Sequence, residues 1–258
     1  MLEAIFLGII QGLTEFLPIS SSAHIRILGE ILPSAQDPGA TFTAIMQIGT
    51  ECAVLLYFAS QIKELLKGGR LARLILVGSL PIFILGYIGQ DYIRDNFRSL
   101  WLIAATLIVF GLLLGYLDHI GRKEKSLNDL TTRDGVLYGI AQSLALIPGV
   151  SRSGATIAMG RFLGYRREEA LRYSFLLAIP AVLGSGAYEL MNSFSEPTNN
   201  FSFGETIAAT VTAFIVGYAV IAWLMKFVQT RSFMPFVVYR VALGALLLTL
   251  LATGTISA

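Results

Sequence analysis

The chain has 258 residues, of which 55% are hydrophobic and 14% are charged, and its formal net charge is +2. An average soluble domain carries about 25% charged residues, so this composition excludes an ordinary soluble domain and indicates a membrane protein. No basic stripe with interleaved aromatic residues is present, so we expect no nucleic-acid partner. The single cysteine, Cys52, excludes an intramolecular disulfide and a thiolate cluster for a metal.

Six apolar runs are each long enough to cross a membrane as a helix. A hydrocarbon core about 30 Å thick needs roughly 20 consecutive apolar residues. These runs predict an all-α polytopic membrane protein. They are residues 42–60, 74–90, 100–117, 173–192, 206–225 and 235–254.

The sequence repeats itself weakly in one fixed register, which places Gln11 on Gln142. We predict two repeats, 1–120 and 132–258, which are joined by a linker at 121–131 within a polar stretch. A sustained match in one register is the sequence signature of a repeated fold. The other matching positions include Ser20 with Ser151, Ser22 with Ser153, and 83–87 with 214–218.

Each repeat begins with a segment that is too interrupted to form one spanning helix. Short apolar pieces flank Pro18 and the serines at 20–22 in the first repeat, and Pro148 and Gly149 in the second. Non-helical backbone at membrane depth is tolerated only inside protein or beside a wet cavity. A kinked spanning helix is the alternative. Two matching interruptions favour a re-entrant helix hairpin in each repeat, followed by three transmembrane helices.

Such a repeat crosses the membrane an odd number of times, so the two repeats must have inverted topology. The loops 61–73, 118–135, 161–172 and 226–234 then lie on one side and hold 14 of the 19 basic residues. The opposite loops hold Arg94 and Arg98. By the positive-inside rule, the basic side is cytoplasmic and both termini face outward. The two hairpins then enter from opposite sides, and their tips can meet inside the bilayer.

The tip in the second repeat has the residues of an anion site. Arg152 supplies a planar guanidinium that suits phosphate oxygens, while Ser151, Ser153 and Thr156 supply hydroxyl groups. The helix that follows directs its first N–H groups and the positive end of its dipole at a bound anion. Close helix packing explains the small residues here, but it does not explain an arginine at membrane depth.

The tip in the first repeat contributes reactive groups. Gln11 and Glu15 lie four residues apart and share a helix face. Ser20 and Ser21 precede His24 by four and three residues, so a hydroxyl can face the imidazole, as in an activated nucleophile. Capping serines beside a structural histidine are the alternative. Opposite an arginine, the combination predicts phosphoryl transfer to serine or to water.

Other polar residues lie inside the predicted spans. Gln47 and Glu51 share one face of the first span, where a carboxylate is not expected to face lipid. Glu51 either helps to hold a cation or pairs with a buried donor. Arg240 is predicted to extend to the cytoplasmic interface, and Arg26 either does the same or guides an anionic substrate.

The motifs QGLTEFLPISSSAH (11–24) and PGVSRSGAT (148–156) resemble those of the undecaprenyl-diphosphate phosphatase family, the bacitracin-resistance type of integral membrane enzyme. Residues 47–58 and 175–190 are also similar, and the resemblance covers essentially the whole chain. It implies an enzyme of the bacterial plasma membrane that hydrolyses a C55 polyprenyl diphosphate to the monophosphate and inorganic phosphate. This reaction would recycle the lipid carrier for peptidoglycan synthesis at the outer face.

The resemblance also implies roles for individual residues. Glu15 matches the essential acidic residue, Ser21 the nucleophile, His24 the proton-transfer partner and Arg152 the phosphate-binding arginine. A divalent cation, Mg²⁺ or Ca²⁺, is implied, with Glu15 and Gln11 as ligands and Glu51 as a further candidate. Gln11 stands where many members have a second glutamate. The substrate-binding shell is expected to include Gln11, Ser20, Ser22, Gln47, Ser151, Ser153 and Thr156.

Two alternatives remain open from the sequence. An activated water could attack the phosphorus directly, with Ser21 only as a ligand. A transporter or flippase of the polyprenyl phosphate carrier would share the inverted repeats, but it would need anion ligands without a nucleophile or base. The expected partners are the diphosphate lipid and the membrane lipids. The oligomeric state is not fixed, and a homodimer is one candidate.

Overall fold

The computed structural model of the chain describes residues 1–31, 40–97, 99–121, 124–193 and 201–256. The helices that it contains are long where the sequence is continuously apolar and short where proline, glycine or serine interrupts it. They are α1 (Leu2–Thr14), α2 (Ser21–Ile31), α3 (Ala40–Tyr57), α4 (Ala59–Leu65), α5 (Arg70–Asn96), α6 (Leu100–Ile120), α7 (Thr132–Ser143), α8 (Arg152–Phe162), α9 (Arg167–Ser193), α10 (Phe203–Thr230) and α11 (Met234–Ala252), with 3-10 turns η1 (Leu127–Asp129) and η2 (Leu144–Leu146).

Among the described residues, five helices are long and apolar enough to cross a membrane, namely α5, α6, α9, α10 and α11. A sixth crossing is formed if α3 and α4 count as one span, although the chain bends by 85° between them. The prediction of an all-α polytopic protein is therefore confirmed. The predicted span 42–60 was too long, because α3 ends at Tyr57 and the chain turns at Phe58.

Both predicted interruptions are present in the structure. Six residues separate α1 from α2, and η2 with a turn separates α7 from α8. In both cases the residue before the second helix has a left-handed backbone, with φ of 73° at Ser20 and 70° at Ser151. This conformation costs a non-glycine residue roughly 1–2 kcal/mol, so it persists only where the surroundings hold it. A continuous kinked helix is therefore wrong for both segments.

The two halves of the chain pack on each other in matching ways. Helix α1 packs against α10, and α7 packs against α5. Both contacts need glycine, because a Cβ at Gly8 would lie 2.4 Å from the Ala209 carbonyl and one at Gly139 would lie 2.2 Å from that of Gly78. The register that places Gln11 on Gln142 also places Gly8 on Gly139 and Gly78 on Ala209. The register found in the sequence therefore also relates two close backbone contacts.

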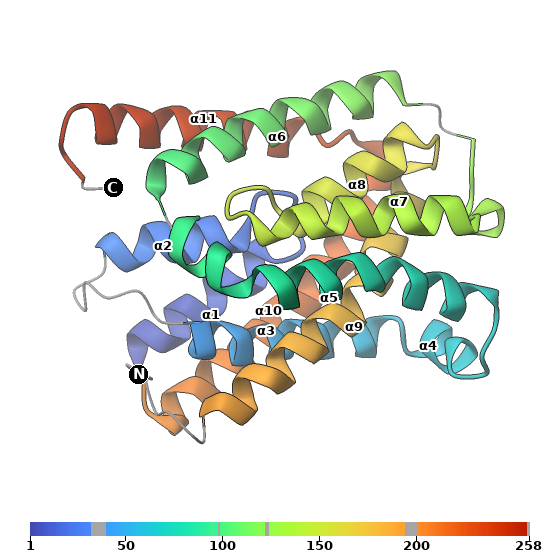
Figure 1. The fold of residues 1–258 in the computed structure, drawn as a ribbon, viewed down its shortest axis with the longest axis horizontal. Coiled ribbons are helices and arrows are strands. Elements are labelled where there is room, and N and C mark those ends of the chain that lie inside the picture. Colours follow the sequence, from blue (N-terminus) through green and yellow to red (C-terminus); the bar gives the residue numbers. More distant parts are fainter. Residues whose placement is uncertain (32–39, 98, 122–123, 194–200, 257–258) are drawn as a thin grey trace.

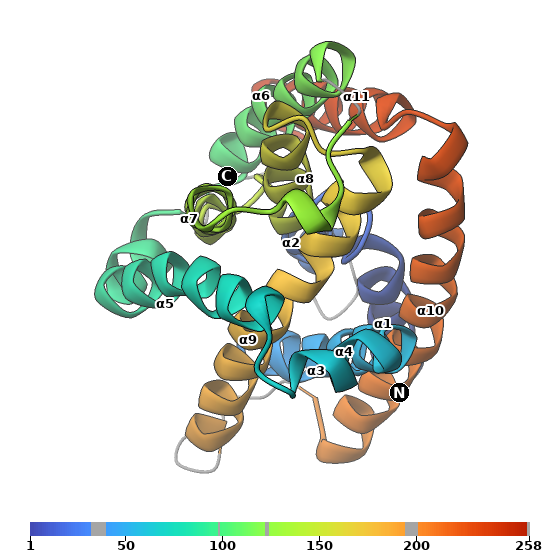
Figure 2. The same cartoon turned by 90° about the vertical axis from the view of Figure 1, so that its right-hand side faces the viewer.

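The short helices bring the interrupted segments to the middle of the molecule. The N-terminus and the end of α11 lie at one end, and the linker before α7 lies at the other (Figure 1). The turn between α1 and α2 and the turn between α7 and α8 both lie between these ends. Viewed end-on, α2 and α8 lie inside a ring of longer helices (Figure 2).

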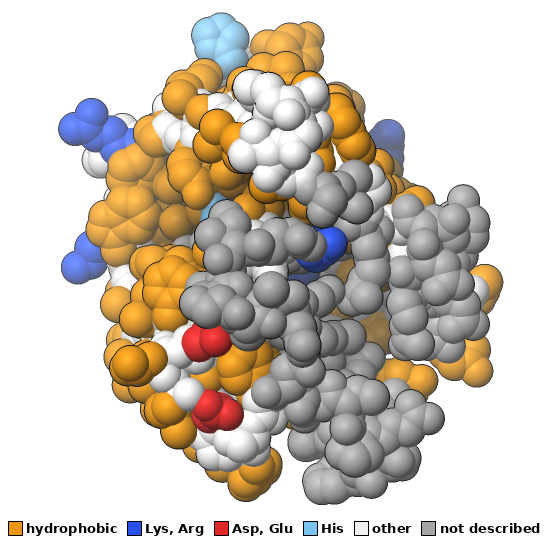
Figure 3. Space-filling model, turned by 90° about the vertical axis from the view of Figure 1, so that its left-hand side faces the viewer, with side chains coloured by type: hydrophobic (Ala, Val, Ile, Leu, Met, Phe, Trp, Pro, Cys, Tyr) orange, Lys and Arg blue, Asp and Glu red, His pale blue; other side chains and the backbone are white. Residues whose placement is uncertain are grey.

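Exposed apolar side chains cover the outside of the long helices, as expected for surfaces that face lipid. Hydrophobic groups gather on the left-hand side of the end that carries the N-terminus (Figure 3). On the long helices they include Leu76, Ile84, Leu112, Ile215 and Val238, each at least half exposed. Lipid hydrocarbon chains solvate apolar side chains, so these helix faces do not need polar residues on their surface.

A buried ion cluster closes the end of the molecule that carries the linker. Asp118, near the end of α6, accepts hydrogen bonds from Arg161 Nε at 2.9 Å and from Arg167 Nε at 2.7 Å. The main-chain N–H of Phe233, just before α11, donates to the same carboxylate at 3.2 Å. These two arginines were expected as loop residues, but they join α6, α8, α9 and α11. The side chain of Arg94 and residues Arg98, Arg122 and Lys123 are not among those described.

Candidate functional site

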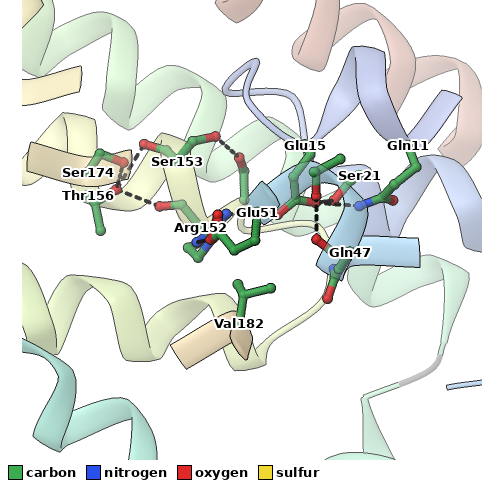
Figure 4. A network of polar contacts seen from close by, with 12 residues as sticks. Gln11, Glu15, Ser21, Gln47, Glu51, Arg152, Ser153, Thr156, Ser174 and Val182 are labelled. Carbon is green, nitrogen blue, oxygen red and sulfur yellow. Dashed lines mark hydrogen bonds and ion pairs between the residues drawn. The ribbon is translucent and has the colours of Figure 1, made fainter. Parts of the chain in front are cut away.

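Arg152 lies between two carboxylates in the middle of the molecule. Its Nη2 is 2.8 Å from Oε1 of Glu15, and its Nη1 is 3.3 Å from Oε1 of Glu51. Arg152 begins α8, Glu15 follows α1 and Glu51 belongs to α3, so the contact joins segments of both predicted repeats (Figure 4). The two glutamates are buried, and the Arg152 side chain is 13% exposed. Burial strengthens this attraction and makes an unpaired charge costly.

Glu15 also holds the first residue of α2. Its Oε2 accepts a hydrogen bond from Ser21 Oγ at 2.6 Å and another from Gln11 Nε2 at 2.7 Å. The spacing of Gln11 and Glu15 predicted their shared helix face, and the structure brings them into contact. A carboxylate that accepts the proton of a serine hydroxyl is placed as a general base for that serine.

His24 contacts other groups than the predicted Ser21 hydroxyl. Its Nδ1 is 2.7 Å from the Ser20 main-chain carbonyl, and its Nε2 is 2.7 Å from the hydroxyl of Tyr239 on α11. The carbonyl can only accept, so Nδ1 carries the hydrogen and Nε2 accepts from Tyr239. The helical spacing placed His24 near Ser20, but it could not identify the main-chain carbonyl as the partner. Both ring nitrogens are engaged away from Ser21.

The other serines tie the two tips together. Ser20 and Ser22 pair through their hydroxyls at 3.2 Å, and Ser151 and Ser153 form the same pair at 3.2 Å. Ser151 also caps the N-terminus of α8. Ser153 donates to the main-chain carbonyl of Leu17 at 3.1 Å, which links the second tip to the first. These predicted substrate ligands therefore also have structural hydrogen bonds.

Thr156 faces α9, and its contact there was missed by the sequence analysis. Its hydroxyl donates to the Arg152 carbonyl at 2.8 Å and lies 2.5 Å from the hydroxyl of Ser174 on α9. Both side chains are buried. A serine inside the apolar run 173–192 was the available signal, but only the packing of α8 on α9 identifies its partner.

Gln47 lies beside Ser21 in the site (Figure 4).

Arg240 was predicted to reach the cytoplasmic interface, and the structure contradicts this prediction. The side chain is 0% exposed. Its Nη2 donates to the carbonyls of Gly149 and Val150 at 2.9 Å each, and its Nη1 donates to the Pro18 carbonyl at 3.2 Å. Gly111 of α6 lets α11 approach closely, because a Cβ there would lie 3.2 Å from Arg240 Cβ. The carbonyls of both tips replace water around the guanidinium.

Two oxygen atoms around this network are suited to a cation. Gln11 Oε1 and Glu51 Oε2 are buried, and neither has a hydrogen-bond partner among the described residues. Carboxylate and amide oxygens are the ligands that Mg²⁺ and Ca²⁺ prefer. Among the described residues, no group of three or more His, Cys, Asp or Glu side chains could hold a metal. The donor set thus fits a hard cation only if the Gln11 amide takes part.

The arrangement combines an arginine, a helix N-terminus and a serine whose proton points to a carboxylate. The arginine and the helix end favour a phosphate group, and the serine can attack it. Because the cluster is enclosed by apolar helices, its electrostatic interactions are stronger than they would be in water. The chemistry that these groups fit is phosphoryl transfer to Ser21 Oγ or to a water beside it.

Comparison with known proteins gives full-length matches. The family model described as "Bacitracin resistance protein BacA" matches residues 4–246. An undecaprenyl-diphosphatase of Micrococcus luteus is 56% identical, with 100% of this chain and 99% of the relative aligned. Undecaprenyl-diphosphatase 2 of Agrobacterium fabrum is also 56% identical, over 100% and 98%. An undecaprenyl-diphosphatase of a Nocardioides species is 54% identical, over 100% and 98%.

Replacing Arg152 should destabilise the fold, because the carboxylates of Glu15 and Glu51 would remain buried without it. We expect Arg152→Met to lower the free energy of unfolding by about 3–5 kcal/mol, because Glu15 and Glu51 lose their shared counter-charge. Adding Glu51→Gln to that variant should restore part of the loss, since one buried charge is then removed. Unfolding of purified protein in one detergent measures both, with Glu51→Gln alone as the control. Strictly additive effects would show that these charges are not coupled.

Proposed function

Because the chain belongs to the bacitracin resistance protein BacA family, we propose that it hydrolyses undecaprenyl diphosphate to undecaprenyl phosphate and inorganic phosphate. The basis for this activity is the name of relatives that are more than half identical to the chain along nearly their whole length. The contact of Ser21 Oγ with Glu15 Oε2, at 2.6 Å, carries the mechanism. It pairs a nucleophile with a base beside the phosphate-binding Arg152.

The proposed reaction has two displacements at the terminal phosphorus. Glu15 takes the Ser21 proton while Oγ forms a bond to phosphorus, and the bond from phosphorus to the bridging oxygen breaks. The bridging oxygen leaves with undecaprenyl phosphate. Water then attacks the phosphoserine, and Glu15 returns its proton to the Ser21 oxygen as the bond from that oxygen to phosphorus breaks. The protons of the water leave with the inorganic phosphate. Arg152 holds non-bridging oxygens through its planar fork, and the N-terminus of α8 adds N–H donors.

The proton-transfer partner in this proposal is Glu15, whereas the family resemblance assigned that role to His24. Glu15 contacts the Ser21 hydroxyl, and both ring nitrogens of His24 have other partners. A role for His24 in catalysis stays a prediction. Direct attack by water, with Ser21 as a ligand, is the competing mechanism. It uses the same Glu15 base, so only the covalent intermediate separates the two.

We propose that a divalent cation, Mg²⁺ or Ca²⁺, binds beside Glu15. Gln11 Oε1, Glu51 Oε2 and a Glu15 oxygen would hold it, since two of these buried oxygens have no other partner among the described residues. When bound, the cation would neutralise charge on the diphosphate. Gln11 is neutral, so the chain supplies one carboxylate fewer than members with glutamate at that position.

We propose that the two repeats have inverted topology and that the site opens to the outer face. The matching Gly8 and Gly139 contacts and the paired backbone conformations of Ser20 and Ser151 support the repeat. The end that carries the linker also carries Arg161 and Arg167, which supports a cytoplasmic assignment. An outward site would recycle the carrier after peptidoglycan synthesis. The homodimer stays a prediction.

Substitutions at the first tip test the enzyme. We expect Ser21→Ala and Glu15→Gln each to lower kcat about 10²–10⁴-fold, because they remove the nucleophile and its base. Together they should cost little more than either alone, since the two groups act as a unit. The measurement is phosphate release from undecaprenyl diphosphate in detergent, with the exposed Ser60→Ala as the control.

Detergent removes the membrane barrier, so a protein that only carried the lipid would release no phosphate there. Release by the unmodified chain therefore separates the enzyme from the flippase. Near-normal turnover of Ser21→Ala would exclude the covalent intermediate and leave the water mechanism. Near-normal turnover of Glu15→Gln would exclude Glu15 as the base in both mechanisms.

The cation proposal is tested at Gln11. We expect Gln11→Glu to lower the cation concentration that gives half-maximal activity by about tenfold, because an added carboxylate strengthens a hard-cation site. Titration of chelated enzyme with Mg²⁺ or Ca²⁺ measures this, and Gln11→Ala should raise the concentration. Full activity in excess chelator, together with no effect of either variant, would contradict the site.

Orientation is tested with single cysteines on a Cys52→Ser background. We expect an impermeant maleimide to label Gly204→Cys, at the start of α10, on intact cells. It should label Gln229→Cys, near the end of the same helix, only after the cells are opened. Both positions are exposed, so the reaction reports the side of the membrane. The reverse pattern would place the termini in the cytoplasm.

A further inference from the structure

Two consecutive residues of α11 contact both interrupted segments. Tyr239 donates its hydroxyl to His24 Nε2 at 2.7 Å, and the two rings stack with centroids 5.6 Å apart. His24 in turn binds the Ser20 carbonyl. The next residue, Arg240, donates to Pro18 in the first tip and to Gly149 in the second. One turn of a single helix thus fixes both loops.

The guanidinium of Arg240 donates its hydrogen bonds to main-chain carbonyls and not to an acidic side chain. It donates to the carbonyls of Gly149 and Val150 at 2.9 Å, and also to those of Leu107 and Thr106 on α6. Among the described residues, no carboxylate forms a hydrogen bond or ion pair with it. Main-chain carbonyls outside helices need hydrogen-bond donors when they lie at membrane depth, and one guanidinium has five N–H groups to donate.

Two of the carbonyls that Arg240 binds, those of Gly149 and Val150, belong to a stretch of chain with unusual backbone angles. Val150 lies between Gly149, with φ of 87°, and Ser151, with φ of 70°. The Ser20 carbonyl, which His24 binds, likewise belongs to a residue with φ of 73°. Backbone strain of this kind is retained only where surrounding contacts over-determine it. The contacts from α11 therefore lie beside the residues whose backbone angles would otherwise change to less strained values.

The α11 contacts have no counterpart in the first repeat. In the register of the repeats, Tyr239 and Arg240 fall on Ile108 and Val109, which have no polar group in their side chains. A carrier built from inverted repeats moves one repeat against the other around its binding site. A buried guanidinium that binds main-chain atoms of both tips opposes such movement.

We propose that Tyr239 and Arg240 are positioning residues that hold the two tips at one fixed separation. Arg240 sets the distance between the segments, and Tyr239 fixes the His24 ring that restrains Ser20. Ser21 directly follows Ser20, and Arg152 lies two residues after Val150, so these two residues then keep a constant separation. The claim about rigidity stands on the contacts alone, whereas its effect on turnover rests on the proposed phosphatase function.

Hydrogen exchange tests the positioning directly. We expect Arg240→Met to speed amide exchange in both tips, residues 15–24 and 147–156, while exchange elsewhere stays unchanged. Tyr239→Phe should speed exchange in the first tip only. Arg161→Met is the matched control, because Arg161 is equally buried but binds Asp118 at the end that carries the linker. Tyr218→Phe is the control for the tyrosine, since both hydroxyls are on partly exposed rings.

Unchanged exchange in either tip of Arg240→Met would overturn the proposal, and so would equal loosening of the tips by Arg161→Met. If Arg240→Met unfolds as a whole, Arg240→Lys decides in its place. Lysine keeps the charge but has three donors in place of five, so it should loosen both tips to a lesser degree. No change at the tips of a folded Arg240→Lys would then overturn the proposal.

Kinetics separate positioning from binding. We expect folded Arg240→Lys to lower kcat about 100-fold, because a displacement of about 1 Å at reacting groups costs that much. KM should change less than about threefold, since Arg152 remains in place. Looser tips with unchanged kcat would contradict the effect on turnover. Full activity of Ser21→Ala and Glu15→Gln would instead contradict the proposed function, whatever the exchange shows.

Discussion

Where a helix is interrupted inside a membrane, its free main-chain carbonyls need hydrogen-bond donors from the protein itself. The contacts at the centre of the molecule meet this requirement. Two interrupted segments bring such carbonyls together at Pro18, Gly149 and Val150, and the Arg240 guanidinium binds all three. The breaks are what free the first N–H groups of α2 and α8 to face a ligand. The buried arginine supplies donors to carbonyls on both sides of the breaks.

A second arginine has the opposite kind of partner. Arg152 contacts two carboxylates, of which Glu15 also accepts the Ser21 proton. When both glutamates are ionised, the cluster of one arginine and two glutamates has an excess of negative charge, so an anion would enter this site most readily with a cation beside it. The buried oxygens of Gln11 and Glu51 are available for that cation. Charge balance therefore links the proposed phosphate binding to the proposed cation.

Much of this arrangement follows from the sequence because it depends on local pattern. The apolar runs, the breaks at Pro18 and Pro148 and the spacing of Gln11 and Glu15 are local, and the structure contains them, apart from the bend that ends the run 42–60 at Tyr57. The partners of His24 and Arg240 are not local. The side chain of Arg240 turns inward because Gly111 lets two distant helices approach, which no property of the last span reveals. Long-range packing decided the features that the sequence analysis missed.

The two tips correspond in the register of the repeats, yet they carry different chemistry. Where the first has Glu15 and Ser21, the second has Leu146 and Arg152. Two copies of the first half would bring one serine to another, and two copies of the second would bring one arginine to another. In the proposed mechanism, neither pairing could both hold a phosphate and attack it. If the proposed repeats arose by duplication, the present centre formed only as the two halves diverged, and the proposed reaction now needs both.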